Sequence, residues 1–316
     1  MTRRFALALL ILTLAGCGGR EAADSGDDHG AEGVGVEAAD TAPTHLGDCI
    51  LLDPKGDVPE DVYQHGDVVA TDAMPPFTKE LQVYGLKLAA RDDISDDFLR
   101  LVAKTIAESF PRDAGLDADL QREVLANHYR YRALIPVPLG DDMSFAEENE
   151  EQWAEIEKNN SVCDIIMQGT PVGPEGQVME VVEHILHYVT DIGLHYTFPE
   201  VWGIAEDSEL AKAMAKAAEE GYYQMDQYAD FEDEEVRFRV QMQEFAYWFI
   251  TTAWNLQAPY GPVWEEEWTI RDQEELREKL PSMYAAYEET AARVMVAPSL
   301  ETLQEIGPTR AEERGN

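Results

Sequence analysis

Prolines set the helix boundaries in the C-terminal half of the sequence. A helix interior excludes proline, because its ring fixes φ and removes a hydrogen-bond donor. Between the prolines, apolar residues recur with the 3.6-residue period of an amphipathic helix. This pattern predicts four helices, at residues 177–193, 208–220, 235–257 and 273–293. The prolines between or outside these segments are Pro171, Pro174, Pro199, Pro259, Pro262 and Pro298.

The region before Gly176 alternates between strand-like and helix-like patterns. Ser95 is a suitable N-cap for a helix that ends near Phe110, and a second short helix is predicted near 117–127. The acidic stretch 141–160 predicts a surface helix or a mobile insertion. The fold class that follows is α+β, with a mainly helical C-terminal half. The predicted strands are 81–89, 129–137 and 163–167.

The N-terminus has the pattern of an export signal. Two arginines precede the apolar stretch 5–14, and the sequence Leu-Ala-Gly-Cys17 follows. The stretch is too short to span a bilayer and predicts a cleaved signal peptide. A cysteine after Leu-Ala-Gly resembles the lipobox of bacterial lipoproteins, in which this cysteine is acylated. The resemblance implies attachment to the cell-envelope membrane through lipid on Cys17. Because Gly18 follows, we expect the outer membrane, with the folded domain in the periplasm or at the cell surface.

The acidity of the chain restricts its partners. The sequence has 24 Lys and Arg against 63 Asp and Glu, a formal charge of −39. Nucleic acids would be repelled and are excluded as partners. Residues 17–46 combine acids with Gly and Ala and predict a disordered tether after the lipidated cysteine. The expected organisation is a signal peptide at 1–16, the tether at 17–46, an irregular lead-in at 47–79, a folded domain at 80–297 and a C-terminal tail at 298–316.

Two cysteines remain after the lipidated one. Cys49 and Cys163 would lie in a compartment that permits oxidation. A disulfide between them and a pair of free thiols are both compatible with the sequence, since spacing alone does not show that the two Cα atoms approach.

The helix at 178–192 carries the candidate chemistry. Its apolar residues form one stripe, and the opposite face carries five titratable side chains. Acids alone on such a face would indicate a solvated surface. Histidine and carboxylate one turn apart instead favour a metal site, because both can point at one ion. The five side chains are Glu180, Glu183, His184, His187 and Asp191.

Two registers of this helix supply an i, i+4 ligand pair. In the first, Glu183 and His187 bind the metal and His184 lies between them. In the second, Glu180 and His184 bind it, and Glu183 precedes the second ligand. In zinc peptidases the residue between the ligands is the general base that takes a proton from metal-bound water.

The sequence Glu183-His-Ile-Leu-His187 resembles the H-E-x-x-H helix of zincin metallopeptidases, in particular the group of the anthrax lethal factor catalytic domain. The likeness extends over about 80–293. It includes SELAKAMAKAAEEGYY at 208–223, EFAYWF at 244–249 and LREKLPSMYAAY at 276–287. It implies a zincin-like α+β fold, one divalent metal and a peptide or protein substrate that is hydrolysed by metal-activated water.

The chain departs from the family by having Glu-His where the motif has His-Glu. Carried over by position, Glu183 is the first ligand, His184 the catalytic base, His187 the second ligand and Glu244 the third. Zinc is the expected metal. Because this set has two carboxylates where the family has one, manganese and iron are better candidates here than in a His/His/Glu site. The alternative is an inactive zincin-fold lipoprotein with a structural or metal-binding role.

Weaker candidates surround this motif. Glu180 and His195 are alternative metal ligands, and Asp191 is placed to orient His187 by a hydrogen bond. Tyr223 and Tyr228 are candidates for stabilising an oxyanion, although packing in the core explains each of them better. A di-iron carboxylate site is disfavoured, because the helix predicted at 235–257 contains no histidine.

Overall fold

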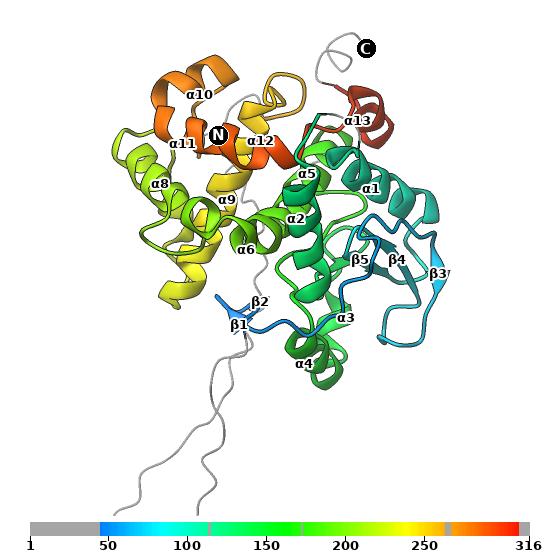
Figure 1. Cartoon of the computed structure of the whole chain (residues 1–316). Coiled ribbons are helices and arrows are strands. Elements are labelled where there is room, and N and C mark those ends of the chain that lie inside the picture. The colour runs from blue at the N-terminus through cyan, green and yellow to red at the C-terminus, as the bar shows by residue number, and fades with distance from the viewer. Residues whose placement is uncertain (1–44, 113–114, 172, 263–266, 310–316) are drawn as a thin grey trace, which may run out of the picture. The chain divides into compact units, whose positions relative to one another are not determined.

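A computed structural model describes residues 45–309, except 113–114, 172 and 263–266 (Figure 1). The predicted signal peptide, Cys17 and nearly all of the predicted tether lie outside the described residues. None of the helices in the described part is long and apolar enough to cross a membrane. The fold class is α+β, as predicted.

A four-stranded sheet lies at one side of the domain (Figure 1). Its order is β3 (Val69–Ala70), β4 (Lys79–Val83), β5 (Leu86–Ala90) and β6 (Leu134–Val137). The first three strands are antiparallel, and β6 is parallel to β5. A separate short pair joins β1 (His45–Leu46) to β2 (Ile50–Leu51).

The single strand predicted at 81–89 is wrong, because this segment turns back as a hairpin. Tyr84 and Gly85 form its two-residue turn, with φ of 50° and 87°. Positive φ at both central residues is what a tight hairpin turn requires. Gly85 also lies against α2 (Ala118–Arg130), where an added Cβ would come within 2.7 Å of the His128 side chain. The turn therefore fixes the sheet against the helix that follows it.

Two helices connect β5 to β6. Helix α1 (Asp96–Ser109) begins at Ser95, whose hydroxyl accepts a hydrogen bond from the amide of Phe98, as an N-cap does. Helix α2 (Ala118–Arg130) continues into the segment that had been predicted as the start of the strand 129–137. That strand therefore begins only at Leu134.

The residues predicted as a strand at 163–167 form no strand. The amides of Cys163 and Asp164 both donate to the hydroxyl of Tyr188, at 3.1 Å, instead of to a neighbouring strand. The acidic stretch before them folds as α3 (Ser144–Glu147) and α4 (Glu150–Asn159). Trp153 anchors α4 by packing against Phe145.

The C-terminal half is helical, as predicted, but its boundaries differ. The helix predicted at 273–293 breaks where Pro281 starts a new helix, and the expected tail at 298–316 contains α13, capped by Ser299. The elements are η1 (Pro174–Gly176), α5 (Gln177–Tyr188), the π-helix η2 (Val189–Leu194), α6 (His195–Thr197), α7 (Pro199–Trp202), α8 (Glu209–Glu219), η3 (Asp226–Tyr228), α9 (Glu234–Ala253), α10 (Gln273–Lys279), α11 (Pro281–Glu289), α12 (Ala291–Val294) and α13 (Leu300–Ile306).

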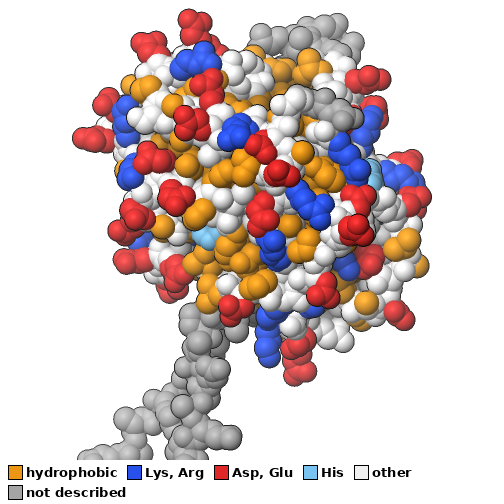
Figure 2. Space-filling view, in the orientation of Figure 1, with side chains coloured by type: hydrophobic (Ala, Val, Ile, Leu, Met, Phe, Trp, Pro, Cys, Tyr) orange, Lys and Arg blue, Asp and Glu red, His pale blue; other side chains and the backbone are white. Residues whose placement is uncertain are grey.

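Helices α5 and α9 pack against each other in the core. The apolar stripe of α5 is buried, and α9 is buried almost continuously from Arg239 to Ala253. Acidic side chains are spread over the visible surface (Figure 2), whereas His184 and His187 of α5 and Asp191 of η2 are buried. The chain thus encloses a set of titratable groups between two central helices.

Candidate metal centre

Glu183, His187 and Glu244 come together between α5 and α9. Each offers one ligand atom, and these atoms all lie within 4.8 Å of one another. His187 and Glu244 have exposed side-chain fractions of 0% and 1%, and that of Glu183 is 13%. The structure therefore brings together the three residues that were assigned as ligands by their positions in the zincin motif.

Hydrogen bonds fix which nitrogen of His187 is free. Nδ1 lies 2.7 Å from Oδ2 of Asp164, and the amide nitrogen of Gln243 donates to the same oxygen at 3.0 Å. Arg239 donates to the other end of the Gln243 amide, which orients its NH₂ group toward Asp164. The Gln243 amide nitrogen also lies 2.6 Å from Nδ1, but the carboxylate of Asp164 can only accept, so a neutral His187 that is hydrogen-bonded to it carries its proton on Nδ1 and presents a lone pair at Nε2.

That lone pair faces a carboxylate. Nε2 of His187 lies 3.8 Å from Oε2 of Glu244. Among the described residues, none donates a hydrogen bond to this Nε2 or to Oε1 of Glu244, although both atoms are buried. Buried polar atoms without a hydrogen-bond partner are costly, and these two belong to side chains that face each other across 3.8 Å. Two atoms bound to one tetrahedral zinc are roughly 3.4 Å apart, so a cation fits this arrangement.

Burial shifts the acid–base behaviour of all three side chains. It lowers the pKa of His187 to about 4, although the hydrogen bond to Asp164 opposes the shift. Burial also raises the pKa of Glu183 to about 8. It raises the pKa of Glu244 well above its usual range, with the charge of Glu183 as the next cause. The imidazole is therefore neutral near pH 7, while the carboxyl groups hold protons that a metal ion would displace.

His184, the expected catalytic base, lies among carboxylates. Its Nδ1 is 3.1 Å from Oε1 of Glu180, and its Nε2 is 3.6 Å from Oδ1 of Asp164. Burial lowers the pKa of His184, but the charges of Asp164 and Glu180 outweigh it and leave the pKa well above its usual range. In the metal-free protein His184 is thus a cation at neutral pH, and a protonated imidazole cannot accept a proton from water.

The alternative ligands lie elsewhere. Glu180 contacts His184 and accepts the amide of Met167 at 2.8 Å. The described residues contain three groups with metal-ligating side chains close together: Glu183, His187 and Glu244; Asp164, His184 and His187; and Cys49, Cys163 and Asp191. His195 belongs to none of them. Its Nδ1 accepts the amide of Ile204 at 3.0 Å. Asp191 does not contact His187 but pairs with Arg239 at 3.3 Å. It therefore reaches the centre only through Arg239 and Gln243.

The two candidate oxyanion tyrosines are both buried near α9. The hydroxyl of Tyr223 donates to the backbone oxygen of Gln241 at 3.0 Å, and that of Tyr228 donates to Glu267. Burial raises the pKa of Tyr228, and the charge of Glu244 adds to the shift. The charge of Glu244 also contributes to the raised pKa of Tyr223, so the two tyrosines differ in their hydroxyl partner, which is Glu267 for Tyr228 and the backbone for Tyr223.

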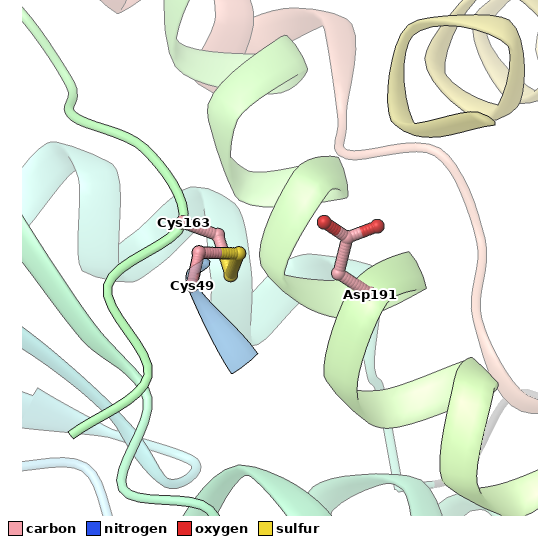
Figure 3. Close-up of side chains that lie close together, drawn as sticks. All are labelled: Cys49, Cys163 and Asp191. Atoms are coloured by element: carbon pink, nitrogen blue, oxygen red, sulfur yellow. A yellow bond between two sulfur atoms is a disulfide. The ribbon is translucent and has the colours of Figure 1, made fainter. Parts of the chain in front are cut away.

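A disulfide joins Cys49 to Cys163, with a Cα–Cα distance of 4.8 Å (Figure 3). This was one of the two states that the sequence allowed. Asp191 lies close to the two sulfur atoms, but sulfurs that are bonded to each other are not thiolate ligands. The bond ties the segment before β2 to the loop that carries Asp164, the residue that holds His187.

Sequence reasoning missed Asp164 and Gln243. Asp164 follows a cysteine in a segment predicted as a strand, and no spacing pattern connects it to α5. Gln243 directly precedes Glu244, and its position one turn after Arg239 is the one signal that could have indicated a hydrogen-bonded pair. No protein-family model, curated protein or solved structure matches this chain.

Proposed function

We propose that this chain is a lipid-anchored envelope protein that binds a divalent cation through Glu183, His187 and Glu244. The observation that carries the proposal is a pair of buried polar atoms without a hydrogen-bond partner among the described residues, Nε2 of His187 and Oε1 of Glu244. Zinc suits the imidazole and the carboxylates, and manganese or iron suits the oxygen-rich set. The lipid anchor rests on the sequence around Cys17.

In this proposal the metal links α5 to α9 and has a structural or storage role rather than a hydrolytic one. Two observations favour this choice over peptide hydrolysis. His184 occupies the position of the base but lies between Asp164 and Glu180. His187 and Glu244 are also almost inaccessible, so a peptide bond would not reach a metal held by them.

Peptide hydrolysis is the second candidate, favoured by the position of Tyr228. Its hydroxyl contacts Glu267, and the charge of Glu244 contributes to its raised pKa. A buried phenol within the electrostatic reach of a metal ligand is a candidate for stabilising a developing oxyanion. Hydrolysis also needs a general base to take a proton from water. Exchanging Glu183-His184 for His-Glu would place a glutamate at the position of that base.

The experiment measures bound metal and peptide cleavage on the same preparations, purified without added metal. We expect at least one tightly bound ion per wild-type chain, and loss of the ion held by Glu183, His187 and Glu244 in His187→Gln and Glu244→Gln. Matched controls are His65→Gln and Glu234→Gln, because both side chains are exposed. Metal without cleavage supports the structural role, and cleavage that Glu244→Gln abolishes supports the peptidase. Absence of tightly bound metal in the wild type would overturn the proposal.

A further inference from the structure

Both histidines of α5 have the same kind of surroundings. His187 has a carboxylate at Nδ1, from Asp164 at 2.7 Å, and another facing Nε2, from Glu244 at 3.8 Å. His184 also has a carboxylate at Nδ1, from Glu180 at 3.1 Å, although this contact lacks hydrogen-bond geometry. Its Nε2 faces Asp164 at 3.6 Å and Glu183 at 3.9 Å. A carboxylate behind a histidine that points its other nitrogen at oxygen ligands is typical of metal sites.

Three carboxylates surround His184. One of them, Glu180, lies at Nδ1, and the other two, Asp164 and Glu183, face Nε2. Oε1 of Glu180 accepts the amide of Met167, which holds this oxygen against Nδ1. Asp164 uses Oδ2 for His187 and Gln243, and its Oδ1 is the atom nearest to Nε2 of His184. One oxygen of Asp164 therefore contacts His187, while the other oxygen faces Nε2 of His184.

The charges in this region favour more than one cation. Arg239 is paired with Asp191, so its charge is already compensated. Four carboxylates surround the two imidazoles: Asp164, Glu180, Glu183 and Glu244. When the four carboxylates are ionised, one divalent ion together with protonated His184 offsets three of their four negative charges, and two ions with neutral His184 offset all four. Burying uncompensated charge is unfavourable, so a second ion would stabilise the ionised forms.

We propose that a second divalent cation binds between Oδ1 of Asp164, Nε2 of His184 and Glu183, and that Glu183 is shared with the first ion. The inference rests on the proposed function, because the shared carboxylate belongs to that site. Metal ions in two-metal centres are about 3.5–4 Å apart, a separation that one carboxylate can bridge. The oxygen-rich ligands suit manganese, iron or zinc.

The test uses the full folded domain with its disulfide intact, loaded with Mn²⁺ and washed with a weak chelator to clear its acidic surface. The wild type should retain two Mn²⁺ per chain by native mass spectrometry. Its electron paramagnetic resonance spectrum should show exchange-coupled Mn²⁺ rather than the six lines of an isolated ion. His184→Gln should retain one ion with six lines, and His65→Gln should match the wild type.

A second variant guards against misfolding of His184→Gln. Glu180→Gln keeps every proposed ligand and should weaken retention of the second ion about 10- to 100-fold while the first stays bound. One retained Mn²⁺ with a six-line spectrum in the wild type would overturn the second site and leave the proposed function standing. Retention of two ions by His184→Gln would also overturn it. If the wild type retained no ion, both proposals would fail.

Discussion

Nδ1 of His187 lies 2.7 Å from Oδ2 of Asp164, a carboxylate located 23 residues earlier in the chain. This contact assigns the proton of the imidazole to Nδ1 and leaves Nε2 as the nitrogen that faces Glu244. The metal site thus depends on a loop residue that is not among the three proposed ligands of the first ion.

We predict that Asp164→Asn weakens metal binding about 10- to 100-fold without abolishing it, because an amide holds the imidazole less firmly and lowers its basicity. Competition with a chromophoric chelator measures the change. Asp230→Asn is the control, since that side chain is exposed. Unchanged affinity in Asp164→Asn would mean that the contact does not orient the ligand.

Metal affinity should rise with pH. The pKa of Glu183 is raised to about 8, and that of Glu244 is raised well above its usual range. Metal binds the ionised carboxylates, so protons compete below these pKa values and the competition fades as pH rises through about 8. Calorimetry at pH 7 in buffers of different ionisation enthalpy should detect proton release on binding. Binding without proton release would contradict the assignment of these two ligands.

Glu244→Gln should have opposite effects on the metal-free and metal-loaded proteins. Without metal, Glu244 is a buried acid beside Glu183, so the amide should leave the free energy of unfolding unchanged or increase it. The wild type should gain about 3 kcal/mol when free metal is 100 times the dissociation constant, and the variant should gain almost nothing. Thermal denaturation with and without EDTA tests both expectations. An equal gain in the two proteins would show that the metal binds elsewhere.

His128 should contribute to acid sensitivity away from the metal centre. Burial lowers its pKa to about 4, with an opposing hydrogen bond to the backbone oxygen of Tyr84. The unfolded chain, with a histidine pKa near 6.5, binds this proton first, so stability falls as pH decreases from about 6.5 to 4. Between pH 7 and 4.5 the wild type should lose about 2–3 kcal/mol more than His128→Asn. Urea denaturation at the two pH values gives this difference, and equal losses would refute the role of His128.

The fold and the proposed ligands were accessible from sequence to different extents. The period of α5 follows from apolar spacing, which placed Glu183 and His187 on its polar face, whereas Glu244 was indicated only by the resemblance to the zincin motif. The contacts of His187 with Asp164 and Gln243 join residues 23 and 56 positions apart, and no local pattern encodes them. The protonation state of His184 could not be predicted either, because it depends on the charge of Asp164, which is distant in the sequence. The hairpin at Tyr84-Gly85 was missed because apolar residues continue on both sides of the turn.

The position of the metal is the most direct test of the account. Crystals of zinc-loaded, chelator-washed protein should give an anomalous peak at the zinc edge within about 2.0–2.2 Å of Nε2 of His187 and of an oxygen from each of Glu183 and Glu244. Zinc found only at surface carboxylates, with no peak between α5 and α9, would contradict the proposed metal centre.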